Sequence, residues 1–113
     1  MYDFTDNTLT ISLSGEIDHH SAMAIREKAD TEIEKRMPRE VVMDLSGTSF
    51  MDSSGLGLIL GRYRKCGALG IPVKLKNPDR QTYRLLVMAG VNKFVKIVFD
   101  KGESENVREA GKR

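Results

Sequence analysis

The chain has 113 residues, of which 40% are hydrophobic and 30% charged, which is enough for one globular domain with a modest core. Its formal net charge is only +2 and the two signs are interspersed, so the composition does not support binding to nucleic acid or to an anionic membrane. No apolar run could cross a bilayer, no secretory pattern opens the chain, and the single Cys66 cannot form an internal disulfide. We therefore expect one soluble domain over residues 1–113 in a reducing compartment, the cytoplasm.

The first third of the chain predicts two strands and a helix. Residues 2–4 form a short strand, and after a turn residues 8–14 alternate apolar and hydroxyl side chains, as a half-buried strand does. We expect Gly15 to break this strand and residues 16–20 to form a loop. Ser21 is the predicted N-cap of a helix that extends to about residue 36.

The middle third predicts a buried strand and a second helix. Pro38 ends the first helix, residues 41–45 form a short apolar strand, and the second helix covers about residues 54–66. The predicted core stripe of this helix consists of four apolar residues, namely Leu56, Ile59, Leu60 and Tyr63. Gly57 and Gly61 lie four positions apart on another face, where they leave the backbone bare for a close neighbour.

The last third predicts a strand over residues 73–76, a third helix, and a final strand over residues 94–99. Asn77 is the predicted cap of the third helix, with a proline at its first position. Residues 100–113 are mostly polar, so we expect a loosely docked tail that forms a weak helix.

This order of elements predicts an α/β fold. Helices that alternate with strands imply a mixed, mostly parallel sheet of about five strands. The first strand is expected to be an antiparallel edge. Three main helices and the weak C-terminal helix complete the expected domain.

The start of the second helix offers more capping groups than one helix needs. Asp52, Ser53 and Ser54 stand in a row, and a single side chain is enough to cap a helix. Either Asp52 or Ser54 can do so, which leaves at least one hydroxyl free. A phosphate at such a position would meet unpaired N–H groups and a favourable helix dipole. The pattern therefore predicts a phosphorylation switch that changes a surface and leaves the fold intact.

Other chemistries fit the sequence less well. The glycines of residues 55–61 do not match the dinucleotide fingerprint and lack the P-loop lysine, so no cofactor is expected. Asp18, His19 and His20 are adjacent in one predicted loop, and neighbours in a loop rarely converge on one metal ion. A serine hydrolase would need an elbow motif that is absent, and a receiver phosphorylated on Asp44 would need an adjacent acid pair. We expect no metal site and no enzymatic activity.

Two motifs carry a family resemblance: FMDSSGLGLILGRY at positions 50–63 and GEIDHHSA at positions 15–22. Together they resemble the anti-sigma factor antagonists of the STAS domain family, nearest to those that act on the anti-sigma F factor of sporulation. The order of strands and helices agrees along the whole chain. In that family the serine directly after the aspartate is phosphorylated, so the resemblance implies that Ser53 is the phosphorylation site.

The resemblance also implies partners. These are an anti-sigma factor that is itself an ATP-dependent serine kinase and a metal-dependent phosphatase that reverses the mark. The unphosphorylated form would bind the anti-sigma factor and free the sigma factor, and the phosphorylated form would not. The residues expected to meet the partner are Asp18, His19, Asp52, Ser54, Gly55, Gly57 and Gly61. The alternative is a STAS scaffold that binds a nucleotide or another ligand without a phosphoswitch.

Overall fold

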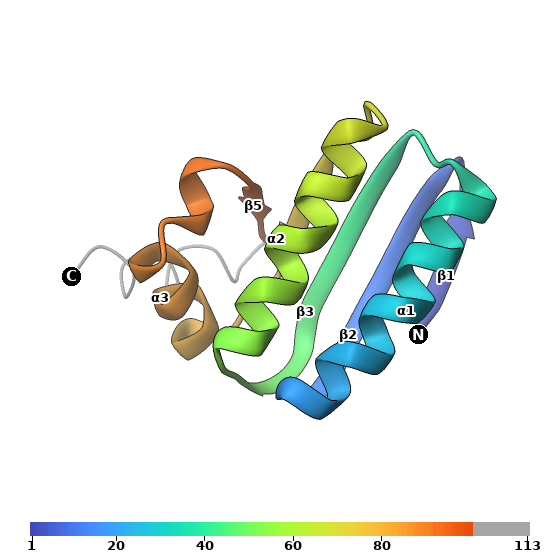
Figure 1. Cartoon of the computed structure of the whole chain (residues 1–113). Helices are drawn as coiled ribbons and strands as arrows, with labels where there is room; N and C mark the ends of the chain where they lie inside the picture. The colour runs from blue at the N-terminus through green and yellow to red at the C-terminus, as the bar shows by residue number, and fades with distance from the viewer. Residues whose placement is uncertain (101–113) are drawn as a thin grey trace.

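The computed structural model describes residues 1–100, and it contains a single five-stranded sheet (Figure 1). The strands lie in the order β1-β2-β3-β4-β5, with β1 antiparallel to β2 and all other neighbours parallel. The predicted α/β fold with an antiparallel edge strand is thus confirmed. The elements in chain order are β1 (Tyr2–Thr5), β2 (Thr8–Ile17), α1 (His19–Arg36), β3 (Glu40–Met51), α2 (Ser53–Ala68), β4 (Val73–Lys76), α3 (Arg80–Met88), the 3-10 helix η1 (Val91–Lys93) and β5 (Lys96–Val98).

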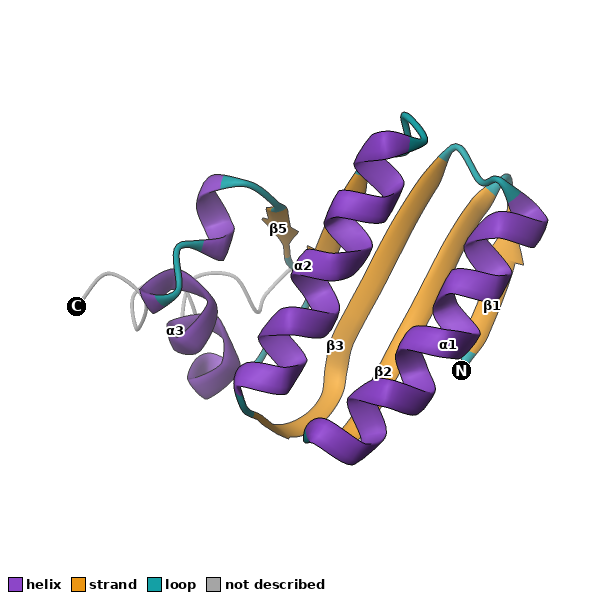
Figure 2. Ribbon diagram, viewed as in Figure 1, coloured by secondary structure: helices purple, strands orange, loops and turns teal. Residues whose placement is uncertain are grey.

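Helices α1 and α2 lie side by side across one face of the sheet, and α3 lies near its β5 edge (Figure 2). Alternate residues of β2, namely Leu9, Ile11 and Leu13, are buried in one core cluster with Ile33 of α1 and Ile59 of α2. This alternation is what one buried sheet face requires. None of the helices within residues 1–100 is long and apolar enough to span a bilayer. The predicted C-terminal helix falls on residues outside the described part, apart from Asp100.

Both central strands are longer than predicted. Gly15 does not break β2, which continues to Ile17, and β3 continues past Leu45 to Met51. The pairing of the two strands shifts register twice near Gly15, whose φ of 72° is readily adopted by glycine. These bulges let the two strands continue together, so Asp44 lies inside β3 and not at its end.

Two predicted helix caps are wrong. Ser21 is not the N-cap of α1, because Asp18 holds that position. Asn77 is not the N-cap of α3, because the Asp79 side chain accepts the capping hydrogen bond. Asn77 instead adopts a left-handed φ of 53° and exchanges two hydrogen bonds with Asp100. In both helices the cap is an aspartate near the predicted residue: Asp18 lies three positions before Ser21, and Asp79 lies two positions after Asn77.

The core stripe of α2 is also rotated from the prediction. Ile59 is fully buried as expected, whereas the other predicted members, Leu56, Leu60 and Tyr63, are only partly buried. Leu58, Arg62 and Cys66 are buried in their place. Leu58 and Cys66 belong to the core cluster, and Arg62 is held on the side that faces α1 by its ion pair with Asp30.

The last strand is shorter than the predicted residues 94–99. It covers Lys96–Val98 only, because the chain before it turns through η1. Phe94 ends that turn and is 63% exposed, so it belongs to the surface and not to the sheet.

Candidate functional site

The starts of α1 and α2 lie next to one another at one end of the sheet (Figure 1). The last residue pair between β2 and β3 joins Ile17 to Met51, and each helix begins directly after it. The backbone N–H of Asp52 also donates to the carbonyl oxygen of Ile17 at 3.3 Å. Asp18 and Asp52 therefore leave the sheet as neighbours, because the carboxyl ends of parallel strands meet at one edge.

Asp52 caps α2. Its backbone is extended, with φ −107° and ψ −165°, and its Oδ1 accepts a hydrogen bond from the Ser54 backbone N–H at 2.8 Å. Its carbonyl oxygen accepts from the N–H groups of Gly55 and Leu56 at 3.0 and 3.2 Å. Of the two candidates that the sequence left open, Asp52 is thus the cap, and Ser54 supplies only a backbone donor.

Ser53 is the first residue of α2, and its side chain is exposed. Within residues 1–100 its hydroxyl makes no hydrogen bond. Ser54, one position later, is half-buried. Ser53 therefore carries the more exposed of the two hydroxyls, at a helix end that favours negative charge.

The start of α1 is closed by a reciprocal pair of hydrogen bonds. Asp18 Oδ1 accepts from the Ser21 backbone N–H at 3.0 Å, and Ser21 Oγ accepts from the Asp18 backbone N–H at 3.0 Å. The bond from the Ser21 N–H is the main cause that lowers the pKa of the Asp18 carboxyl below its ordinary value. Asp18 thus presents an ionised carboxylate at neutral pH, and His19 follows it as an exposed residue.

The three glycines of the predicted partner surface differ in their surroundings. Gly55 is buried, and a Cβ at this position would overlap Met51 Cγ and lie 2.9 Å from Met51 Sδ and 3.2 Å from Ile17 Cγ2. Gly55 is thus required for the packing of α2 on the sheet. A Cβ on Gly57 or Gly61 would meet nothing within 4 Å among the described residues. These two leave the backbone open, as their spacing predicted.

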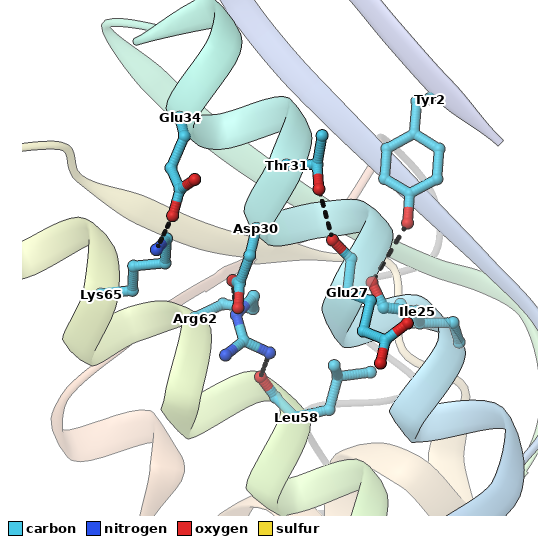
Figure 3. Close-up of polar contacts among 9 residues, drawn as sticks. All are labelled: Tyr2, Ile25, Glu27, Asp30, Thr31, Glu34, Leu58, Arg62 and Lys65. Carbon is cyan, nitrogen blue, oxygen red and sulfur yellow. Dashed lines mark hydrogen bonds and ion pairs between the residues drawn. The ribbon is translucent and has the colours of Figure 1, made fainter.

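Sequence reasoning missed one buried charged pair between the two helices. Arg62 of α2 is only 6% exposed, and its Nε lies 2.8 Å from Asp30 Oδ1 of α1 (Figure 3). The Arg62 Nε–H and the Asp30 oxygen are not aligned for a hydrogen bond, so the contact is an ion pair. A weak contact of 3.5 Å joins Arg62 to the Leu58 carbonyl oxygen. The sequence contained a signal for the burial of Arg62, because this residue lies four positions after Leu58 and three after Ile59, on the same face of the helix.

Other reactive side chains of residues 1–100 form no further centre. No three His, Cys, Asp or Glu side chains in this part of the chain are grouped so that they could hold a metal ion. Cys66 is fully buried, and desolvation raises the pKa of its thiol to about 11. Because the thiolate is the nucleophilic form, Cys66 is unreactive at neutral pH.

The chain is similar in sequence and in fold to known proteins. The chain is 39% identical over 89 residues to an anti-sigma F factor antagonist of Paenibacillus polymyxa, which covers 79% of this chain and 76% of the relative. It is similar to the solved structure of the anti-sigma factor antagonist SpoIIAA in its unphosphorylated form, with a TM-score of 0.78, 31% identity and coverage of 98% and 96% of the two chains. For the phosphorylated form of the Bacillus SpoIIAA the TM-score is 0.72, again at 31% identity, with coverage of 96% and 97%.

The similarity extends over nearly the whole chain. The model of the STAS domain family matches residues 1–104, which include both helix starts and all five strands. The family resemblance of the two sequence motifs is thus confirmed by a match that also includes the last third of the fold. The chain belongs to the STAS domain family.

Proposed function

We propose that this chain is an anti-sigma factor antagonist of the cytoplasm, switched by phosphorylation of Ser53. The observation that carries the proposal is the exposed Ser53 hydroxyl, which makes no hydrogen bond beside a helix end that Asp52 already caps. The relatives named as anti-sigma factor antagonists support it, and so does the solved SpoIIAA in a phosphorylated and an unphosphorylated form.

In this proposal the unphosphorylated chain binds an anti-sigma factor that is itself a serine kinase, and so releases a sigma factor. The contact surface is formed by Asp18, His19, Asp52, Ser54, Gly57 and Gly61, with Gly55 holding α2 against the sheet. The chain catalyses nothing. The kinase supplies ATP and the catalytic groups, and a metal-dependent phosphatase removes the phosphate.

Electrostatics gives the switch its direction. Phosphorylation of Ser53 adds about two negative charges beside the Asp52 carboxylate, at the end of the sheet where Asp18 also lies. The helix N-terminus stabilises the added phosphate, so the fold is retained. A partner surface that fits the unmodified site would then face added bulk and negative charge, which weakens the complex.

The proposal is tested first by modification. The chain is incubated with ATP and the anti-sigma F factor of the organism that encodes it, and the phosphorylated residue is located by mass spectrometry. We expect phosphate on Ser53, none on a Ser53→Ala variant, and normal modification of Ser54→Ala. Phosphate on another residue, with Ser53 unmodified, would contradict the proposal.

Binding provides the second test. Ser53→Asp should weaken the affinity for the anti-sigma factor about a hundredfold by calorimetry. Ser46→Asp is the matched control, since Ser46 is exposed on β3 and lies outside the proposed surface. Equal affinity of Ser53→Asp and wild type, together with tight binding of GTP or ATP, would favour the alternative of a ligand-binding STAS scaffold.

A further inference from the structure

A groove with a volume of about 610 Å³ lies between α1 and α2. Residues three or four positions apart line it on both sides, including His19, Met23 and Arg26 of α1 and Gly57, Gly61 and Lys65 of α2. On α2 the lining extends from Ser54 to Lys65, a length of about 16 Å at 1.5 Å per residue. An elongated groove parallel to two helices has the shape that receives a third helix of about three turns.

The α2 side of the groove contains two open glycines. Gly57 and Gly61 lie four positions apart, and a Cβ on either would touch no atom of residues 1–100. Glycine weakens a helix interior, and no described part of this chain uses the space that these two glycines leave. A helix from outside could therefore approach the α2 backbone closely, since the separation of packed helices depends on the side chains at the contact.

The groove also carries one unpaired positive charge. Arg26, Arg62 and Lys65 line it against a single carboxylate, that of Asp30. Asp30 neutralises Arg62, and Lys65 forms an ion pair with Glu34 at 2.5 Å (Figure 3). Arg26 is exposed and has no ion-pair partner within residues 1–100. A complementary occupant would bring a carboxylate to Arg26.

We propose that an acidic amphipathic helix of the anti-sigma factor lies in this groove, with small residues over Gly57 and Gly61 and a carboxylate at Arg26. The inference rests on the proposed function, because one end of the groove reaches His19 and Ser54, beside Ser53. It also gives the switch a specific target. A phosphate on Ser53 would repel the acidic helix at the end of the groove where the partner docks.

Two variants of the full chain test the groove by calorimetry with the anti-sigma F factor of the same organism. Gly61→Leu fills the groove, and Arg26→Glu reverses the charge of its unpaired cation. Each should raise the Kd about tenfold or more. The controls are Gly67→Leu, at another open glycine of α2, and Lys35→Glu, at an exposed lysine of α1, because neither residue lines the groove. Both controls should bind like wild type.

The outcomes separate this inference from the proposed function. Binding by wild type with unchanged affinity in Arg26→Glu and Gly61→Leu would overturn the inference and would remove Gly61 from the proposed contact surface. The proposed switch would stand, because modification of Ser53 and the affinity of Ser53→Asp test it separately. A wild-type chain that does not bind the anti-sigma factor would overturn both. Because Arg26 is exposed, its variant should fold even if Gly61→Leu does not. A homodimer of wild type that Gly61→Leu dissociates would assign the groove to a second copy and overturn the inference.

Discussion

The two neighbouring helix starts use the same cap and differ in what they leave free. Asp18 and Asp52 have nearly the same backbone conformation, with φ −104° and −107°, and each carboxylate accepts one backbone N–H of the first helical turn. At α1 the Ser21 Oγ accepts a hydrogen bond from the backbone N–H of the cap residue, Asp18, and lies 3.0 Å from the Glu16 carbonyl oxygen. At α2 no side chain of residues 1–100 accepts a hydrogen bond from the Asp52 backbone N–H, which donates to the Ile17 carbonyl oxygen instead.

The cause of this difference is the third residue of each helix. In α1 it is Ser21, and in α2 it is Gly55, which packs against Met51 too closely for any Cβ. The second helix therefore cannot form the reciprocal cap, and its serines stand one and two positions after the cap instead. The comparison teaches that α2 has a closely packed glycine where α1 has a capping hydroxyl, while the Ser53 hydroxyl lies at the first helical position, outside the cap and exposed.

The largest effect should follow from forcing the two helix starts to be alike. Gly55→Ser places a serine where α1 has Ser21, but its Cβ would overlap Met51. We expect the free energy of unfolding to fall by about 2 kcal/mol, as in other overpacked cores, measured by urea denaturation. Gly67→Ser is the control at an open glycine of the same helix and should leave the stability within about 0.5 kcal/mol. A Gly55→Ser variant as stable as wild type would show that packing does not cause the difference.

A smaller effect should distinguish the two serines. Ser21→Ala removes the reciprocal bond at α1 and leaves the Asp18 N–H without its partner, so we expect a loss of about 1 kcal/mol in unfolding free energy. Ser53→Ala removes a hydroxyl with no hydrogen bond within residues 1–100 and should change stability by less than about 0.5 kcal/mol. Thermal unfolding of both variants measures the contrast. Equal losses would mean that the Ser53 hydroxyl also stabilises the fold.

The smallest effect concerns protonation at α1. The pKa of Asp18 is lowered in the folded chain, so its carboxylate stabilises the fold above its ordinary pKa of about 3.9. That contribution is lost as the pH falls through the lower folded value. An NMR titration should place the Asp18 carboxyl below the ordinary value. In Asp18→Asn the part of the acid destabilisation due to this group should disappear, and an Asp18 pKa at or above 3.9 would contradict the assignment.

The order of the elements could be predicted because its signals are local. The alternation of Leu9, Ile11 and Leu13 and the stop at Pro38 need only a few neighbouring residues to be recognised. The strand ends could not be predicted in the same way. Whether Gly15 breaks a strand or lies in a bulge depends on its pairing with Thr48 of β3, more than thirty positions later.

The residues of the candidate site also differ in whether local sequence signals predict them. The cluster of residues 52–54 could be found from three capping residues in a row, whereas the choice of Ser53 within it came from the family resemblance. The openness of Gly57 and Gly61 could be predicted from their spacing. The packing role of Gly55 depends on the position of the Met51 side chain, and the burial of Arg62 depends on Asp30 of another helix. Contacts between elements decide these features, and a local pattern does not contain them.

The two hydrogen bonds between Asn77 and Asp100 have a consequence for the β5 edge of the sheet. Strand β5 has only three residues and stands at the edge, where unpaired backbone groups can add a strand from another molecule. The Asn77 backbone N–H donates to the Val98 carbonyl oxygen at 2.9 Å, and the side chain holds Asp100 just beyond the strand. With the exposed Lys96 on the same strand, this short anchored edge is a poor template for aggregation.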